Sequence, residues 1–351
     1  GIEDCLYLDI KTPITNDSQL LPVMFWIHGG GNTSGLKDIY NFSKMVKRHD
    51  VIVVTINYRL GAFGWFTHPA IQSDQDGIDK TSNFGTLDII QALKWVKSNI
   101  NSFGGDPNNI TIFGESAGGH NVLSLLVAPQ AKGLFHKAIS QSGYTTSVSK
   151  DRAYITEEDN PTYKHTSNEV VKRLVPNSDK ITLFELKEKL YSLSSKDFFS
   201  EYSDSSNLVM PLLTNDDIVI PEIGLENALK YNRHTLNIPL IAGSNRDEVK
   251  LWLAAAEYFV ELGYSLFGSI TGIPKVKLKN EDGFEAFNFY RSEAWKIRGV
   301  IEPLSALNDS GNSNTFAYRY DWDDHRKFII ADFKKLIGAS HGTAIQLLTG
   351  K

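Results

Sequence analysis

The sequence has a single cysteine, Cys5, among its 351 residues. One thiol cannot close an intramolecular disulfide or build a thiolate metal cage, so the fold must rest on its hydrophobic core. Long apolar runs are also missing: none approaches the roughly 20 residues needed to cross a bilayer, and the N-terminus lacks the basic-then-apolar layout of a signal peptide. We therefore expect a soluble chain without a transmembrane segment, whose compartment (cytoplasmic, secreted or periplasmic) stays open.

Basic residues are not in excess either. There are 36 Lys and Arg residues against 41 Asp and Glu residues, a formal net charge of -5. Without a basic stripe to grip phosphates, a nucleic-acid partner is not expected. The sequence also has no His/Cys/Asp cluster with metal-ligand spacing, so we expect no metal ion. What the sequence does have is 41% hydrophobic residues, enough for one large α/β domain or two ordinary ones.

Short apolar runs alternate with helical patterns along the chain. Between 83 and 101, apolar residues recur at helical spacing. Continuous apolar runs at 21–28 and 51–58 are typical of strands buried on both faces. We expect further strands at 110–113, 136–143, 238–243 and 315–322. Strands that alternate with helices predict a mostly parallel, doubly wound sheet with helices on both faces.

Two regions interrupt this alternation. Residues from about 150 to 237 are polar and rich in Ser and Asp, with one amphipathic piece at 181–193, and we expect them to form a cap or insertion. Further helices are expected at about 249–300, from the segments 254–268 and 284–295.

The segment "TIFGESAGG" (111–119) places Ser116 between glycines, at the junction of a predicted strand and a predicted helix. Small residues relieve the crowding of a sharp turn there, and they leave the Ser116 hydroxyl projecting at the carboxyl edge of the sheet. This G-x-S-x-G pattern favours a nucleophilic serine. The alternative is a serine that merely caps the following helix.

A second glycine-rich turn, "HGGGNTSG" (28–35), follows another predicted strand. Backbone N–H groups of such a loop can stabilise the oxyanion that forms when a serine attacks an ester, because no side chain obstructs them. We expect Gly30, Gly31 and the N–H of Ala117 to supply these donors. A merely flexible glycine turn is the alternative.

Several further segments accompany these two motifs. They are, in order, "EDCLYLDI", "FWIHGGG", "NYRLGAFGWF", "NFGTLDIIQALKWVKSNINSFGGDPNNITIFGESAGG" and "AISQSG". With them the chain resembles the type B carboxylesterases, the cholinesterase-like branch of the α/β-hydrolases. The resemblance is strong over about 1–145, with shorter matches at "GSNRDEVKLW", "YRYDW" and "GASHG". It implies one α/β-hydrolase domain over 1–351, with helical cap insertions.

The resemblance also implies an acid at Glu248 and a base at His341, which complete a Ser-His-Glu triad with Ser116. The order of these residues agrees with the predicted elements, since each lies beyond a predicted strand. A serine needs such an imidazole because its own pKa is far too high for a useful alkoxide at neutral pH.

The residues alone leave alternatives to this triad. His325 also follows the last strand, although the charges of "DWDDHRK" favour a solvated or ion-paired imidazolium there. Asp247 is adjacent to Glu248, and only the family pattern favours the second acid. We expect Glu115 to brace the site through hydrogen bonds. Ser142 resembles the serine that supports the triad in this family, and a plain strand-end serine is its alternative.

The chain also departs from the family pattern. Asn32 stands where an aromatic residue usually follows the three glycines, so we expect an acyl or alcohol pocket of different shape. The aromatic choline-binding element of cholinesterases has no counterpart here, so a cholinesterase proper is not expected. Cys5 matches a family half-cystine whose partner would lie upstream.

Together these features predict a serine hydrolase of small-molecule carboxylic esters that works through an acyl-enzyme and needs no cofactor. One alternative is a non-catalytic adhesion module of the cholinesterase type, although such modules generally lose the serine or the histidine. The other is a related lipase, amidase or carbamate hydrolase, which the triad does not exclude. The oligomeric state cannot be predicted from the sequence.

Overall fold

The computed structural model describes residues 2–14, 19–156, 158, 166–202, 213–264, 275–325, 327–328 and 330–350. Among these residues, no helix is both long and apolar enough to pass through a membrane.

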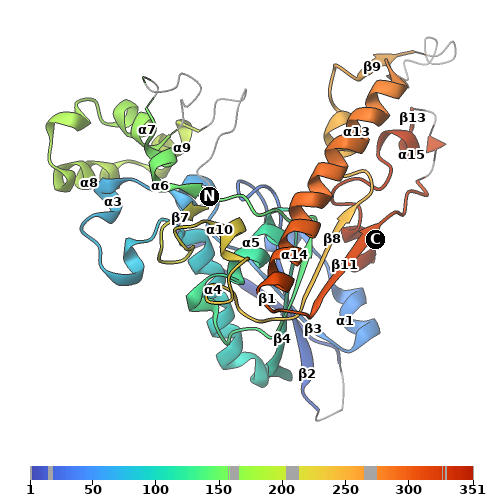
Figure 1. Cartoon of the computed structure of the whole chain (residues 1–351), viewed down its shortest axis with the longest axis horizontal. Helices are drawn as coiled ribbons and strands as arrows, with labels where there is room; N and C mark the ends of the chain where they lie inside the picture. The colour runs from blue at the N-terminus through green and yellow to red at the C-terminus, as the bar shows by residue number, and fades with distance from the viewer. Residues whose placement is uncertain are drawn as a thin grey trace.

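A seven-stranded sheet lies at the centre of the molecule (Figure 1). Its strands, in spatial order, are β1 (Leu8–Lys11), β3 (Ile52–Ile56), β2 (Leu21–Ile27), β4 (Gly105–Glu115), β5 (Lys137–Gln141), β8 (Leu240–Asn245) and β11 (Thr315–Tyr320). Edge strand β1 runs antiparallel to β3, and every other pairing in this sheet is parallel. The mostly parallel sheet predicted from the alternation of elements is therefore confirmed.

Strand β4, which leads to Ser116, begins earlier than predicted. It starts at Gly105 and not at 110, and Gly105 pairs with Leu21 of β2. The register then shifts between Leu21 and Val23, where the ladder with β2 becomes irregular. The turn residues of "GDPNN" (105–109) are typical of a break between elements, but pairing with a neighbouring strand draws this segment into the sheet.

Helices cover both faces of the sheet. Helices α4 (Phe84–Asn99) and α5 (Ala117–Leu125) contribute to the main apolar core on one face, and α1 (Ser43–His49) and α16 (Ile345–Thr349) pack on the other. Figure 1 shows α4 and α1 on opposite sides of the strands. In β2, Phe25 belongs to the first core and Trp26 to the second, as the period of two residues in a strand requires.

The remaining α-helices in the described part of the chain are short, apart from α13. They are α2 (Gly61–Trp65), α3 (Pro69–Gln72), α6 (Lys150–Tyr154), α7 (Ser167–Leu174), α8 (Leu183–Ser192), α9 (Ser195–Ser200), α10 (Leu225–Ala228), α11 (Lys250–Leu253), α13 (Glu281–Lys296), α14 (Glu302–Asp309) and α15 (Phe333–Leu336). Three two-stranded sheets pair β6 (Val148–Ser149) with β7 (Thr214–Asn215), β9 (Val260–Gly263) with β10 (Lys275–Leu278), and β12 (Lys327–Phe328) with β13 (Ala331–Asp332).

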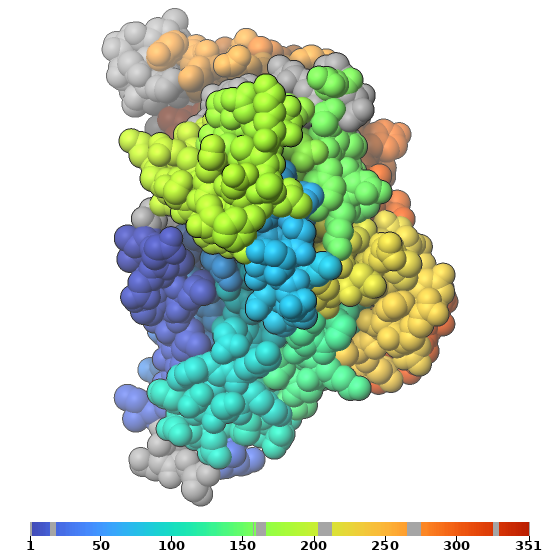
Figure 2. All heavy atoms as spheres, turned by 90° about the vertical axis from the view of Figure 1, so that its left-hand side faces the viewer, coloured from blue at the N-terminus to red at the C-terminus, as the bar shows by residue number. Residues whose placement is uncertain are grey.

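Helices α7, α8 and α9 form a group away from the central sheet, at the upper left of Figure 1. Figure 2 faces this group, which lies above the α4 segment in that view. The amphipathic piece at 181–193 forms α8, whose N-terminus carries a capping box between Thr182 and Glu185. Val170, Leu186 and Phe66 share a separate apolar cluster, which joins the group to the segment around α2 and α3.

The helix predicted at 254–268 is wrong. Helix α11 ends at Leu253, and residues 260–263 form strand β9, which pairs antiparallel with β10. Residues 265–268 lie outside the described part of the chain. The window begins with three alanines, but β-prone Phe259 and Val260 follow, Gly263 disfavours a helix, and a partner strand is at hand. The second predicted helix, 284–295, lies within α13.

Candidate active site

Ser116 occupies the sharp turn between β4 and α5. Its backbone has φ 59° and ψ -122°, a conformation that costs energy for any residue except glycine. The flanking glycines permit this turn: a Cβ at Gly114 would lie 2.6 Å from the Gly118 backbone, and one at Gly118 would lie 2.0 Å from the Ile27 carbonyl oxygen. The Ser116 side chain makes no capping hydrogen bond to α5. Ser116 is therefore held in a strained turn, and the interpretation of it as a helix cap is wrong.

Glu248 and His341 form a buried hydrogen-bonded pair. Nδ1 of His341 lies 2.7 Å from Oε2 of Glu248, whose side chain is 0% exposed. The other carboxylate oxygen accepts the N–H of Asn245, at the end of β8, at 2.7 Å. The N–H of His341 donates to the backbone oxygen of Glu248 at 3.1 Å. These contacts fix the proton of the neutral imidazole on Nδ1 and leave Nε2 as an acceptor.

The Nε2 edge of His341 faces the serine turn. Oε1 of Glu115, the residue before Ser116, lies 3.3 Å from Nε2. Nε2 has no hydrogen-bond partner within the described residues. The imidazole and the turn that carries Ser116 are therefore neighbours, with Nε2 available to take a proton.

Burial and the neighbouring carboxylates shift the pKa of His341 in opposite directions. Burial alone would lower the pKa of His341, but the hydrogen bond to Glu248 and the charges of Glu115 and Glu248 outweigh it and raise that pKa. Burial raises the pKa of Glu115 to about 6, and the charge of Glu248 adds to this, whereas the imidazole and the N–H of Gly342 oppose it. Proton uptake at His341 and Glu115 is therefore coupled.

The glycine loop 28–35 lies against the serine turn. A Cβ on Gly29 would lie 3.1 Å from the Cβ of Ser116. Gly30 and Gly31 have φ of 105° and 66°, in the region that favours glycine, and the Gly30 carbonyl accepts the N–H of Ser34 at 3.0 Å. Among the described residues, no hydrogen bond uses the N–H of Gly30, Gly31 or Ala117 as its donor. The assignment of these three groups as oxyanion donors stays a prediction.

The model of the carboxylesterase family matches residues 1–267, which is more than half of the chain. The chain belongs to the carboxylesterase family. This confirms the resemblance drawn from the sequence motifs.

Individual members of the carboxylesterase family are similar to this chain. Rat (Rattus norvegicus) liver carboxylesterase B-1 is 37% identical over 294 residues, which cover 78% of this chain and 50% of the relative. Para-nitrobenzyl esterase of Bacillus subtilis (strain 168) is 49% identical over 156 residues, covering 44% of this chain and 31% of the relative. The chain thus spans about half, or less, of these relatives.

A solved structure of PNB esterase superposes with a TM-score of 0.72 at 29% identity, covering 99% of this chain and 71% of that one. The predicted α/β-hydrolase fold is therefore confirmed for this carboxylesterase-family chain.

The rival residues considered from the sequence are engaged elsewhere. The carboxylate of Asp247 accepts from Arg246 at 2.7 Å, from the Asn288 amide at 2.8 Å and from the Ala339 N–H at 3.0 Å. Nε2 of His325 bonds the Gly338 carbonyl at 2.7 Å. Both side chains therefore hold the loop that leads to His341 in this carboxylesterase-family structure.

Two further histidines near the site are packed against tyrosines. His28 stacks on Tyr58 with ring centroids 4.4 Å apart, and His120 stacks on Tyr144 at the same distance. Burial lowers the pKa of His120 to about 4, so its imidazole is neutral at pH 7.

Ser142 also has an unusual backbone, with φ 50°. Its N–H donates to the Gly243 carbonyl at 2.7 Å, and its carbonyl accepts from Nε1 of Trp295 at 3.1 Å. These contacts join the ends of β5 and β8 to α13. The predicted support of the triad by the Ser142 side chain stays a prediction.

Two tryptophans beside His341 escaped the sequence analysis. The ring centroids of Trp295 and Trp252 lie 4.8 and 5.1 Å from that of His341, and the two indoles stack on each other at 5.7 Å. Aromatic residues at helical spacing on α13 are typical of core packing, so their pattern gave no sign of this contact. Indole faces stabilise a neighbouring cation, and here they border the imidazole.

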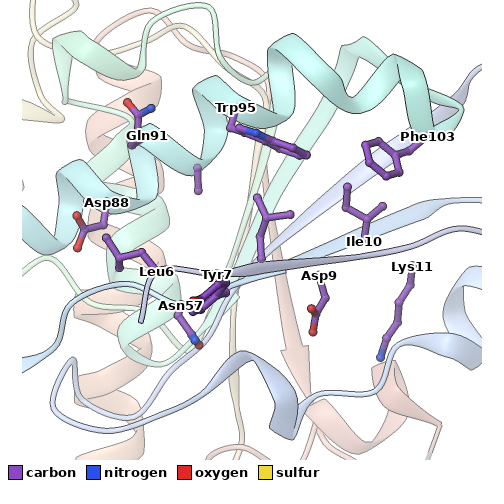
Figure 3. A pocket seen from close by; sticks show the side chains of 12 residues that line it. Leu6, Tyr7, Asp9, Ile10, Lys11, Asn57, Asp88, Gln91, Trp95 and Phe103 are labelled. Atoms are coloured by element: carbon purple, nitrogen blue, oxygen red, sulfur yellow. The ribbon is translucent and has the colours of Figure 1, made fainter. Parts of the chain in front are cut away.

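A pocket of about 840 Å³ lies apart from Ser116, Glu248 and His341, between β1 and α4. Figure 3 shows Trp95, Phe103 and Ile10 around this space. No candidate site residue lines it, and one of its rim groups, Asp88, is bound at 2.7 and 2.8 Å by Arg59. Within the described residues, no group of three or more His, Cys, Asp or Glu side chains is placed to hold a metal ion.

Proposed function

We propose that this chain hydrolyses carboxylic esters of small molecules through an acyl-enzyme formed on Ser116, with His341 as the base and Glu248 as its carboxylate partner. The observation that carries the proposal is the buried Glu248–His341 hydrogen bond of 2.7 Å beside the strained Ser116 turn. The carboxylesterases among the relatives support the ester as substrate class.

The proposed reaction uses these groups in turn. Nε2 of His341 accepts the hydroxyl proton as Oγ of Ser116 attacks the ester carbonyl carbon. The carbonyl oxygen becomes an oxyanion, which the N–H groups of Gly30, Gly31 and Ala117 stabilise. When the intermediate collapses, the imidazolium returns the proton to the departing alcohol. Water then attacks the acyl-enzyme by the same route and releases the carboxylic acid.

Two carboxylates assist the imidazole in different ways. Glu248 accepts Nδ1–H, which keeps the productive tautomer and stabilises the imidazolium that forms during each half-reaction. Glu115 lies at the other nitrogen, 3.3 Å from Nε2, and its negative charge favours the same imidazolium. We propose that Glu115 braces the site and that Glu248 is the triad acid.

The segment at about 150–237 is proposed to act as a cap on a single catalytic domain through its helices α7 to α9, because its later part, with Leu213, Val219 and Leu225, belongs to the main apolar core. Its helices α7 to α9 pack through their own apolar cluster and not through the core of the sheet. An insertion of this kind can differ between relatives without disturbing the triad. Its contribution would be to acyl or alcohol preference.

A panel of p-nitrophenyl esters, from acetate to palmitate, tests the proposal with Ser116→Ala as the matched inactive variant. The proposal predicts turnover of at least the shorter esters by the wild type and a loss of about 10⁴-fold or more in kcat for Ser116→Ala. Equal rates for wild type and Ser116→Ala would contradict it. No turnover of any ester, or of a matching amide or carbamate, would support the adhesion module.

A further inference from the structure

The side chain of Asn32 is turned into the protein interior. Asn32 follows the three glycines and has φ 59°, a left-handed conformation that asparagine tolerates better than most residues. Its side chain is buried, with the residue 8% exposed. The Nδ2 group of Asn121 donates to Oδ1 of Asn32 at 2.9 Å, and Nδ2 of Asn32 lies 3.5 Å from Oδ1 of Asn121. The Asn32 side chain is therefore engaged in an internal amide pair, and the expected difference in pocket shape stays a prediction.

The partner of Asn32 lies on the helix that begins at the serine turn. Asn121 is fully buried in α5, four residues and one helical turn after Ala117, the first residue of that helix. Ala117 carries one proposed oxyanion donor, and Gly30 and Gly31 carry the other two. The amide pair therefore joins the loop that holds two donors to the helix that holds the third.

The loop is also anchored at both ends of its three glycines. The Tyr58 hydroxyl donates to the backbone oxygen of His28 at 2.7 Å and lies 3.3 Å from Oδ1 of Asn32. The backbone oxygen of Asn32 accepts the N–H of Gly61 at 2.7 Å. These contacts hold the loop to the body of the domain, and among the hydrogen bonds of the described residues the amide pair is the one that connects Asn32 to α5.

We propose that the Asn32–Asn121 amide pair is a positioning device, which sets the N–H groups of Gly30 and Gly31 relative to that of Ala117. The inference rests on the proposed function, because it assigns a task to the residues behind the oxyanion donors. Neither amide touches the substrate. The pair is uncharged, so it holds its geometry at every pH at which the fold is intact.

Loss of the pair should raise the energy of the transition state more than that of the bound ester. The oxyanion exists only after attack, so misplaced donors lower kcat and leave KM nearly unchanged. Removal of one complete donor costs about 10²–10³-fold in kcat. Displaced donors keep part of their interaction, so we expect a loss of roughly 10- to 100-fold for Asn121→Ala.

The test measures kcat, KM and the inhibition constant of a trifluoromethyl ketone, which forms an oxyanion adduct with an active serine. Asn121→Ala removes the amide from α5, and Asn32→Gly removes it from the loop while keeping a residue that accepts positive φ. Each variant should raise the inhibition constant by the factor by which kcat/KM falls, with KM within about threefold of wild type. The double variant should lose little more than either single one.

Ser124→Ala provides the matched control, because Ser124 is a buried polar residue of α5 whose hydroxyl bonds within the helix, to the His120 carbonyl at 2.9 Å. It should leave the inhibition constant unchanged. Titration with a fluorophosphonate gives the fraction of active chain in each sample. Because kcat is calculated per active chain, partial unfolding of a variant is not mistaken for a lower kcat.

Three outcomes would overturn the inference: kcat within twofold of wild type, a loss confined to KM, or additive losses in the double variant. With an active wild type these results contradict the positioning role alone. A wild type that hydrolyses no ester and does not bind the ketone contradicts the proposed function as well.

Discussion

Replacing Glu248 by glutamine tests the triad through its hydrogen bonds. One carboxylate oxygen accepts the N–H of Asn245 and the other faces Nδ1 of His341, both at 2.7 Å. A glutamine has one acceptor oxygen and one NH₂ group that only donates. The buried N–H of Asn245 needs an acceptor, so the amide oxygen stays on that side. The NH₂ group then faces Nδ1, and the proton of the neutral imidazole moves to Nε2, where it blocks transfer from the serine.

The size of the loss distinguishes a wrong tautomer from a weaker hydrogen bond. An acid-to-amide change of this kind in a serine protease triad costs about 10⁴ in kcat, or roughly 5 kcal/mol of transition-state stabilisation. One lost hydrogen bond without a tautomer change costs about 1–3 kcal/mol, or roughly 5- to 150-fold. We therefore expect Glu248→Gln to lower kcat by about 10³-fold or more.

The assay is kcat on p-nitrophenyl acetate, with the melting temperature of each variant recorded. Asp247→Asn is the matched control, because it makes the same change in the neighbouring acid, whose carboxylate pairs with Arg246 at 2.7 Å. Asp247→Asn should lower the melting temperature and keep kcat within about tenfold of wild type. The reasoning is refuted if Glu248→Gln stays within tenfold of wild type, or if Asp247→Asn loses more activity than Glu248→Gln.

Further predictions concern the histidines and Glu115. His341→Ala should lower kcat about as much as Ser116→Ala, roughly 10⁴–10⁶-fold, with little added loss in the double variant. By contrast, His325→Ala should cost less than about tenfold, since its ring bonds a backbone carbonyl; the reverse result would make His325 the base. The base must be neutral, so kcat/KM falls as the pH drops through the pKa of His341, which gives the pH profile an acid limb. The charge of Glu115 helps to raise that pKa. Glu115→Gln should therefore move the acid limb to lower pH. An unchanged limb or a shift to higher pH would count against the proposed contact. Burial lowers the pKa of His120 to about 4, so its contribution to stability is complete above about pH 6.5 and is lost as the pH falls toward 4. Between pH 7 and pH 5 the wild type should lose about 2 kcal/mol of unfolding free energy that a His120→Gln variant does not lose, as measured by urea unfolding; equal losses in the two proteins would contradict this.

The central part of the fold could be predicted because its strands are buried on both faces. Runs such as 21–28 and 51–58 carry apolar residues almost without interruption, and parallel burial is what such runs require. The prediction failed at 254–268, where strand pairing between β9 and β10 decided the structure. The partner strand β10 lies at Lys275–Leu278, beyond the window 254–268, so that window does not contain the pairing.

In the candidate site, features formed by neighbouring residues could be predicted, and contacts between distant residues could not. The Ser116 turn could be recognised because its glycines are adjacent in sequence and because only glycine fits where the backbones approach so closely. The amide pair of Asn32 and Asn121 could not, since its members are 89 positions apart and each alone is typical of a loop or a helix surface. Trp295 was missed for the same reason, because its contact with His341 joins two segments that are far apart in the sequence.

Covalent labelling tests the central claim most directly. The wild type is treated with a fluorophosphonate, and its intact mass and peptides are measured by mass spectrometry beside Ser116→Ala and His341→Ala. An activated Ser116 predicts one phosphonyl group per chain, located on Ser116, with no label on Ser116→Ala and much slower labelling of His341→Ala. Label on another residue, or labelling of His341→Ala as fast as that of the wild type, would contradict the account.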